Sequence, residues 1–191
     1  MNQPARRYWP AMFALIVALA AIDQAAKHAV VAHLTPGVPV PVVGDWARLL
    51  LVFNPGAAFS MGQGSTWLFT CFQLAFLVGV MVYAPRVKDP WTATGLALIG
   101  GGAAGNLVDR LTRPPQFFLG HVVDFISIGR FAVFNIADAA ITVGVIAFLV
   151  GMVLQEVRAR ATDSPDSRAE EQPGGQPGSR PGDHPAQHPE Q

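Results

Sequence analysis

The sequence predicts an all-α membrane protein with four transmembrane helices and a small extracytoplasmic β-rich element with its loop. Three observations lead to this fold class. Only 14% of the 191 residues are charged, 51% are hydrophobic, and the mean hydropathy of +0.33 is high for a soluble protein. Four separate apolar stretches are long enough to cross a bilayer. A polar segment rich in proline and glycine follows the last of them.

The four apolar stretches approach the length of about 20 mostly apolar residues that a transmembrane helix needs. In chain order they run from about Pro10 to Val31, from Trp67 to Tyr83, from Trp91 to Val108 and from Phe131 to Leu154.

Basic residues at the ends of these stretches predict the orientation of the helices, because Lys and Arg are enriched in short cytoplasmic segments. They precede the first span, fill the link between the second and third, and follow the fourth: Arg6, Arg7, Arg86, Lys88, Arg158 and Arg160. Both termini should therefore be cytoplasmic, and the loops at about 32–66 and 109–130 should face outside. Arginines within these outer loops argue against this orientation: Arg48, Arg110, Arg113 and Arg130.

The outer loops contain sequence that is typical of short strands. The run Arg48–Phe53 is rich in Leu, Val and Phe, and the turn-forming sequence Asn54-Pro55-Gly56 closes it. Two further extended pieces, His121–Ile128 and Phe131–Phe134, flank Gly129-Arg130. We expect a small sheet that rests on the outer membrane surface.

The composition changes at about residue 161. Residues 161–191 contain six prolines and four glycines among polar residues and no aromatic residue, so they cannot bury enough apolar surface to offset the entropy of ordering. We therefore expect a membrane domain over residues 1–160 and a disordered cytoplasmic tail over residues 161–191.

Polar residues gather at the predicted outer ends of the spans, where ionisable side chains are costly and usually mark function. The i,i+4 spacing of Asp23 and Lys27 allows an ion pair on one face of the first helix. The remaining polar residues come from the ends of the third and fourth spans and from the two outer loops: Asn54, Asn106, Asp109, Arg110, Asp124, Asn135 and Asp138.

Paired carboxylates are the chemistry that this clustering suggests. Two carboxyl groups held close together cannot both ionise easily, so they can share a proton and divide acid and base work. An Asn three residues before an Asp, as at Asn106 and Asn135, can orient that carboxylate through a hydrogen bond. The three aspartates Asp109, Asp124 and Asp138 give three possible pairs, and the residues alone do not choose among them.

Several classes of function are disfavoured. A formal net charge of zero gives no global basic field for nucleic acid, and a single cysteine, Cys71, excludes an internal disulfide and a multi-thiolate metal site. No HExxH or comparable pattern is present, so we expect no metal and no cofactor. A transporter or channel component, or a non-catalytic protein that binds lipidated partners, stays possible on these residues.

Five motifs resemble, in order, those of the lipoprotein signal peptidases, also called signal peptidase II, which are membrane aspartyl peptidases of bacteria. The resemblance covers about residues 10–155 and leaves out the tail. The motifs are Asp23-Gln24-Ala25-Ala26-Lys27, Asn54-Pro55-Gly56-Ala57-Ala58-Phe59, Gly101-Gly102-Ala103-Ala104-Gly105-Asn106-Leu107-Val108-Asp109-Arg110, Val122-Val123-Asp124-Phe125 and Phe134-Asn135-Ile136-Ala137-Asp138.

The resemblance assigns roles that the residues alone leave open. It implies that Asp124 and Asp138 are the catalytic dyad. It implies that Asn54, Gly56, Asn106, Arg110 and Asn135 bind substrate or shape the site, and that Asp23, Lys27 and Asp109 support the architecture.

The resemblance also implies a substrate and a place in the cell. The expected reaction is cleavage of prolipoproteins just before a diacylglyceryl-modified cysteine, in the bacterial inner membrane and near its outer face. The expected partners are these precursors and membrane lipids, and we expect a monomer. The sequence departs from the family pattern in a longer segment at about 111–120 and a short link from Asp124 to Asp138.

Overall fold

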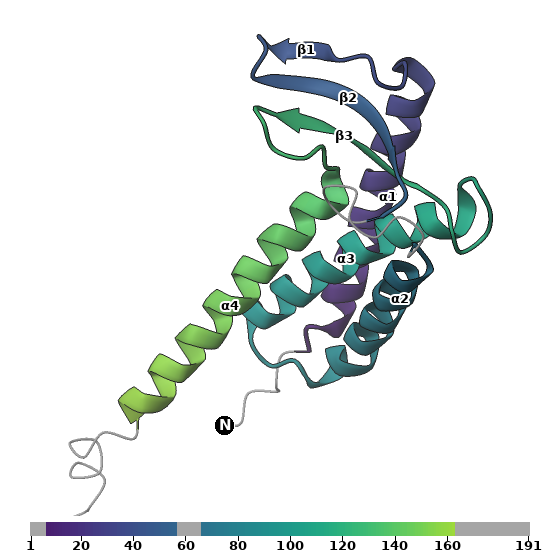
Figure 1. Cartoon of the computed structure of the whole chain (residues 1–191). Coiled ribbons are helices and arrows are strands. Elements are labelled where there is room, and N and C mark those ends of the chain that lie inside the picture. The colour runs from purple at the N-terminus through teal and green to yellow at the C-terminus, as the bar shows by residue number, and fades with distance from the viewer. Residues whose placement is uncertain (1–6, 57–65, 163–191) are drawn as a thin grey trace, which may run out of the picture. The chain divides into compact units, whose positions relative to one another are not determined.

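The computed structural model describes residues 7–56 and 66–162, which form four long helices and one three-stranded sheet (Figure 1). The chain divides into two compact units, Met1–Leu154 and Gln155–Gln191, and every residue of the predicted site lies in the first. The helices are α1 (Trp9–His33), α2 (Thr66–Tyr83), α3 (Pro90–Thr112) and α4 (Ile136–Thr162), with a short 3-10 helix, η2 (Ala84–Arg86), after α2. The strands are β1 (Val40–Val43), β2 (Ala47–Asn54) and β3 (Val122–Ile128).

Three of the described helices are long and apolar enough to cross a membrane. They are α1, α2 continued to Arg86, and α4 to Ala161, with hydropathies of 1.6, 1.9 and 2.3. Large apolar side chains on them, such as Ile22 and Phe72, are more than half exposed, as expected for surfaces that lipid covers. The structure has a helix, α3, at the predicted third span, but α3 is not among these three because its glycines and polar residues lower its hydropathy.

Helix α3 packs closely against both α1 and α4. A Cβ atom on Gly105 would lie 2.6 Å from the Asp23 carboxylate of α1, and one on Gly102 would overlap the carbonyl oxygen of Ala137 in α4. The glycine-rich run therefore allows the close backbone approach that the sequence indicates. Because neighbours cover it on two sides, α3 has many buried residues, whereas α1 and α2 have few.

The direction of the helices follows from these contacts. Lys27 in α1 meets Asp109 in α3, and Ile16 lies near Gly100, so α1 and α3 run parallel. Gly95 lies against Phe148 while Gly102 lies against Ala137, so α4 runs antiparallel to α3. As a result, the end of α1, the end of α3 and the start of α4 meet, and Figure 1 shows the sheet at this same place.

The sheet has the order β1-β2-β3 and is antiparallel throughout. The strands predicted at Arg48–Phe53 and His121–Ile128 are confirmed as β2 and β3, within a residue at each boundary. β1 was not predicted, because its short sequence contains a proline and all four of its residues are exposed. Of the predicted extended piece at Phe131–Phe134, only Phe134 forms an isolated bridge, to Ile126.

A small apolar core fixes the sheet to the helices. Leu51 of β2 and Val123 and Phe125 of β3 are buried and pack against Ala26 and Val30 near the end of α1. Because successive side chains of a strand point to opposite faces, anchoring Val123 and Phe125 fixes where Asp124 points.

The start of α4 differs from the expectation. The sequence predicted a helix from about Phe131, but α4 begins at Ile136. Asn135, directly before it, accepts a hydrogen bond at Oδ1 from the Asp138 amide, while its own amide donates to Asp138 Oδ2. This reciprocal pattern is a capping box, which fixes the N-terminal end of the helix. Asn135 is thus a cap and not a residue inside the span.

Candidate active site

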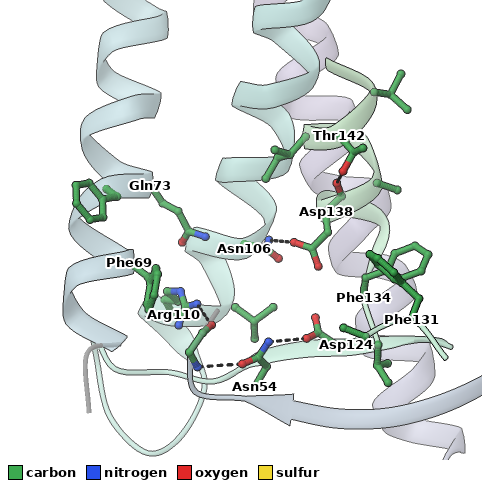
Figure 2. Close-up of a pocket in the computed structure, with 18 residues that line it drawn as sticks. Asn54, Phe69, Gln73, Asn106, Arg110, Asp124, Phe131, Phe134, Asp138 and Thr142 are labelled. Carbon is green, nitrogen blue, oxygen red and sulfur yellow. Dashed lines mark hydrogen bonds between the residues drawn. The ribbon is translucent and has the colours of Figure 1, made fainter. Parts of the chain in front are cut away.

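A cavity of about 650 Å³ lies where the ends of the helices meet the sheet (Figure 2). Asp124 and Asp138 both line it, together with Asn54, Gly56, Asn106 and Arg110. The rest of the lining is largely apolar or aromatic and comes from α2, from the first residue of β3, from the segment before α4 and from α4: Phe69, Phe72, Gln73, Val122, Phe131, Ala132, Val133, Phe134, Ala139, Ile141, Thr142 and Val143.

Asp124 is held by two neutral amides. It pairs across the sheet with Val52, so Asn54 is its diagonal neighbour on the same face. Asn54 Nδ2 donates to Asp124 Oδ2 at 2.9 Å, and Asn135 Nδ2 donates to Oδ1 at 2.7 Å. Only 3% of Asp124 is exposed. The strand and the two amides therefore fix this carboxyl group at the cavity wall.

Asp138 is fixed by the first turn of α4 and by α3. Its Oδ2 accepts the Asn135 amide of the capping box at 3.2 Å, and Asn106 Nδ2 donates to its Oδ1 at 2.8 Å. The N-terminal turn of a helix favours negative charge, because unpaired backbone N–H groups point toward it. Figure 2 shows the Asp138 and Asp124 carboxyl groups on the same side of the cavity, with Asn106 reaching Asp138 from α3.

The two asparagines of the repeated Asn-x-x-Asp pattern connect the aspartates. Asn135 Nδ2 lies 3.1 Å from Asn106 Oδ1, and each amide reaches the aspartate of a different segment. Lys27 Nζ donates to Asn106 Oδ1 at 2.8 Å, which leaves Asn106 Nδ2 free to donate to Asp138. The chain of contacts therefore runs from Asp124 through Asn135 and Asn106 to Asp138.

A second group of charged residues lies behind this site and away from the cavity. We call Asp23, Lys27, Asp109 and Arg113 the buried ion cluster. Lys27 Nζ lies 2.7 Å from Asp23 Oδ2 and 2.8 Å from Asp109 Oδ2, with all three side chains fully buried. Arg113 Nε lies 2.6 Å from Asp109 Oδ1.

The buried ion cluster also determines where α4 begins. Asp23 Oδ1 accepts a hydrogen bond from the backbone amide of Ala137 at 2.9 Å, which satisfies one unpaired donor of the first turn of α4. Asp109 Oδ2 accepts from the Val123 amide at 3.2 Å. The cluster thus holds the backbone next to both Asp124 and Asp138.

Arg110 is the cation that faces the cavity. Its Nη2 donates to the Gly56 carbonyl oxygen at 2.9 Å, and its guanidinium lies 5.7 Å from the centre of the Phe69 ring. Its Nε and Nη1 are buried and have no hydrogen-bond partner among the described residues. Gly56 is itself held in a turn, since its amide donates to Asn54 Oδ1 at 2.9 Å. Arg110 Nε and Nη1 need an acceptor that the described part of the chain does not supply.

Burial raises the pKa of the Asp124 carboxyl group to about 7, and the neighbouring Asp138 carboxylate adds to the rise. The hydrogen bonds from Asn54 and Asn135, together with the charge of Lys27, oppose it. A carboxyl group with this pKa holds a proton into the neutral range beside a second carboxyl group.

The site has no arrangement that suits a metal ion. Within residues 7–56 and 66–162, no group of three or more His, Cys, Asp or Glu side chains is placed to hold one. What the site offers is two close carboxyl groups, neutral amides that orient them, and a cation with unused donors. Fold and site together define a membrane protein with the paired carboxyl groups of an aspartic peptidase.

Comparison with known proteins gives the family. The profile of the family described as "Signal peptidase (SPase) II" matches residues 15–154. A lipoprotein signal peptidase of Rhodococcus jostii (strain RHA1) is 46% identical over 139 residues, which cover 73% of this chain and 70% of that protein. One of Mycobacterium avium (strain 104) is 43% identical over 149 residues, covering 78% of this chain and 81% of that protein.

Solved structures show the same fold. One bacterial membrane enzyme determined by the in meso method has a TM-score of 0.72 at 22% identity and covers 86% of this chain and 98% of its own. Another has a TM-score of 0.67 at 24% identity, with coverages of 78% and 97%. The chain belongs to the signal peptidase II family. It is an aspartic peptidase of the bacterial membrane, and its function is the removal of signal peptides from prolipoproteins.

The structure brings the predicted site residues together, with one difference in placement. Asn54, Gly56, Asn106 and Arg110 line the cavity with the two aspartates, whereas Asn135 is fully buried behind them. Part of the second motif, residues 57–59, lies outside the described residues, as does Arg6. Sequence reasoning missed the α2 wall formed by Phe69, Phe72 and Gln73. Their i, i+3, i+4 spacing was the available signal, because it places them on one helix face.

Proposed function

We propose that Asp124 and Asp138 form the catalytic dyad, and that they cleave the peptide bond just before a diacylglyceryl-modified cysteine. One observation carries this assignment. Both carboxyl groups line the same cavity, and their partners are neutral amides, whereas Asp23 and Asp109 are neutralised by Lys27 away from the cavity. Acid and base work requires carboxyl groups that can exchange a proton with substrate.

In this mechanism the pair begins with a single proton. The ionised carboxylate takes a proton from a water molecule, whose oxygen attacks the scissile carbonyl carbon while the protonated carboxyl group donates its proton to the carbonyl oxygen. The tetrahedral intermediate then collapses: the C–N bond breaks as the carboxyl group that took the water proton gives it to the departing nitrogen, and the other carboxylate takes the proton of one hydroxyl group as the carbonyl reforms, so that the pair again holds one proton. The products are a signal peptide with a new carboxyl end and a protein that begins with the lipidated cysteine.

Arg110 supplies the complementary charge. Arg110 lines the same cavity, and its Nε and Nη1 have no partner among the described residues, so in this proposal they donate to the oxygen on which negative charge develops. Asn54, Asn106 and Asn135 orient the two carboxyl groups, and Gly56 holds Arg110 through its carbonyl oxygen. In this scheme Asp23, Lys27 and Asp109 act through structure, because they position the start of α4 and the backbone of β3.

We further propose that α3 also crosses the membrane, which gives four transmembrane helices, and that both termini are cytoplasmic. α3 has 23 residues, enough to cross a bilayer, and two neighbouring helices cover it from lipid, which removes the need for a highly apolar surface. With basic residues at the opposite end of the helices, the cavity lies near the outer face. A lipid-anchored substrate holds its scissile bond at that depth. The enzyme works as a monomer among membrane lipids.

The proposal is tested by incubating the purified protein with a synthetic peptide that carries a diacylglyceryl-cysteine after a signal-peptide segment. Mass spectrometry should find one cut, directly before the modified cysteine, and no cut in the same peptide without the lipid. Cleavage of the unlipidated peptide at an equal rate would contradict the proposed substrate. Cleavage at the parent rate by Asp124→Asn and Asp138→Asn variants would contradict the dyad.

A further inference from the structure

Gln73 of α2 is a cavity residue that neither the motifs nor the dyad uses. It lines the cavity next to Phe69 and Phe72, and Figure 2 shows its side chain extending from α2 into the space that the two aspartates face. α2 is apolar enough to cross a membrane, so a primary amide in it is costly unless it has a partner.

Gln73 lacks such a partner for its acceptor. Its Oε1 is buried and accepts no hydrogen bond from any residue within 7–56 and 66–162. Two threonines of α2 near the cavity do have partners for their hydroxyl groups. Thr66 donates to the carbonyl oxygen of Pro55, and Thr70 donates to the carbonyl oxygens of Thr66 and Phe118. A buried, unsatisfied amide oxygen in an otherwise apolar wall indicates a group whose partner arrives with the ligand.

The chemistry of the missing partner is restricted. An acceptor oxygen needs an N–H or O–H donor. The ester groups of a diacylglyceryl anchor carry only acceptors, whereas every peptide unit of the substrate except proline carries an N–H. Peptide N–H groups of the substrate can therefore supply a donor to Gln73 Oε1, whereas the ester groups of its lipid anchor cannot.

The position along α2 indicates which peptide unit this is. Phe69 packs against Arg110, the cation next to the dyad, and Gln73 lies one turn further along α2, about 6 Å. An extended peptide rises about 3.3 Å per residue, so this distance corresponds to roughly two residues. Gln73 is displaced toward the middle of α2, where the apolar signal peptide has to lie.

We propose that Gln73 is a substrate-binding residue whose Oε1 accepts the backbone N–H of the signal peptide about two residues before the scissile bond. This inference rests on the proposed function. With this hydrogen bond α2 would help to select an extended peptide backbone, and the selection would not depend on the side chains of the substrate.

The test compares Gln73→Met, which keeps an unbranched side chain without the amide, with Leu74→Met, an adjacent α2 residue that is exposed and does not line the cavity. Substrates are the lipidated peptide and versions in which an ester oxygen replaces one backbone N–H at successive positions before the cut. We expect Gln73→Met to lower kcat/KM about tenfold on the ordinary peptide, with unchanged thermal unfolding, and Leu74→Met to match the parent.

The ester substitutions identify the donor. In the parent protein one position, about two residues before the cut, should lower kcat/KM about tenfold, and in Gln73→Met that same position should cause no further loss. A Gln73→Met variant with the kcat/KM of the parent would overturn the inference. So would ester substitutions that lower kcat/KM at every position by the same factor in the variant as in the parent. Neither result would contradict the dyad. A parent protein that does not cleave the lipidated peptide would overturn both.

Discussion

This protein has two pairs of aspartates, Asp23 with Asp109 and Asp124 with Asp138, and the two pairs differ in the groups that contact them. In the buried ion cluster, Lys27 lies 2.7 Å from Asp23 and 2.8 Å from Asp109. In the dyad, Asp124 and Asp138 are held by the amides of Asn54, Asn135 and Asn106, with no cation in hydrogen-bond contact among the described residues. The residue types are the same, and only the second pair faces a cavity.

The difference teaches why one pair supports structure and the other can carry chemistry. An ammonium group in direct contact favours the charged form of a carboxyl group, and Lys27 contacts both Asp23 and Asp109, which ties this pair to a structural role. An amide donor orients a carboxyl group but leaves its proton exchangeable. Lys27 joins the two regions, since it also donates to Asn106 and thereby orients the amide that holds Asp138.

The largest expected effect comes from removing an acid from the dyad. Asp124→Asn keeps the size of the side chain and one of its two acceptor oxygens but cannot exchange a proton, so we expect kcat/KM to fall by about 10³-fold or more. Thermal unfolding should stay close to that of the parent, because a buried carboxyl group next to another carboxylate is replaced by a neutral amide. Initial rates on the lipidated peptide measure this, and a loss below about tenfold would exclude Asp124 from the chemistry.

The matching change in the buried ion cluster should act on stability. Lys27→Met leaves Asp23 buried without a cation and Asp109 with Arg113 alone, which costs about 3–5 kcal/mol in the free energy of unfolding. Denaturation of the purified protein in detergent measures this cost. As a control, Arg160→Met removes an exposed ion pair with Glu156, 79% and 61% exposed, and should change little. Equal stability of the two variants would show that the cluster is not a structural support.

A third prediction concerns pH. The pKa of Asp124 is raised to about 7, first by burial and then by the charge of Asp138. Below this value Asp124 keeps its proton, and above it Asp124 is ionised, so no acid remains to protonate the scissile carbonyl oxygen. We therefore expect kcat/KM to fall above about pH 7, approaching tenfold per pH unit. A pH profile that is flat from 6 to 9 would contradict this assignment of the proton.

Asn54 provides a smaller and more specific change. Its hydrogen bond to Asp124 stabilises the ionised carboxylate and so opposes the raised pKa. In Asn54→Asp the oxygen that accepts the Gly56 amide is kept, while the donor is lost and a negative charge is added. The falling limb of the pH profile should therefore move to higher pH. A shift to lower pH, measured on the same substrate, would show that Asn54 does not act on Asp124 in this way.

Removal of residues 163–191 should have the smallest effect. The dyad, the buried ion cluster and the cavity all lie within the first compact unit, Met1–Leu154. We expect unchanged kcat/KM and unchanged thermal unfolding for the shortened protein. A loss of activity in well-folded shortened protein would show that the predicted tail contributes to catalysis.

Much of the fold followed from local pattern. Apolar length predicted α1, α2 and α4, and β-type runs closed by turn residues predicted β2 and β3. The start of α4 was misplaced because Phe131–Phe134 is apolar, and apolar length alone does not detect the Asn135 cap. β1 carries too weak a pattern to be predicted, since its residues are exposed and one is a proline.

The sequence predicted which residues form the site but not which of them contact one another. Charge placement gathered the aspartates and asparagines, and the family motifs separated Asp124 and Asp138 from Asp109. Which amide contacts which carboxyl group depends on how separate segments pack, as for Asn54 with Asp124, 70 positions apart, and Asn106 with Asp138, 32 positions apart. Gln73 was missed because a single amide in an apolar helix has no local pattern, and only the cavity shows what it faces.

The most direct test makes the same substitution in both carboxylate pairs. Purified Asp138→Asn and Asp23→Asn are compared for thermal unfolding and for cleavage of the lipidated peptide, with rates expressed per folded molecule. We predict that Asp138→Asn unfolds like the parent and loses cleavage by about 10³-fold or more, whereas Asp23→Asn unfolds more easily and keeps cleavage within about tenfold. Cleavage by Asp138→Asn at the parent rate would contradict the assignment of Asp124 and Asp138 as the catalytic pair.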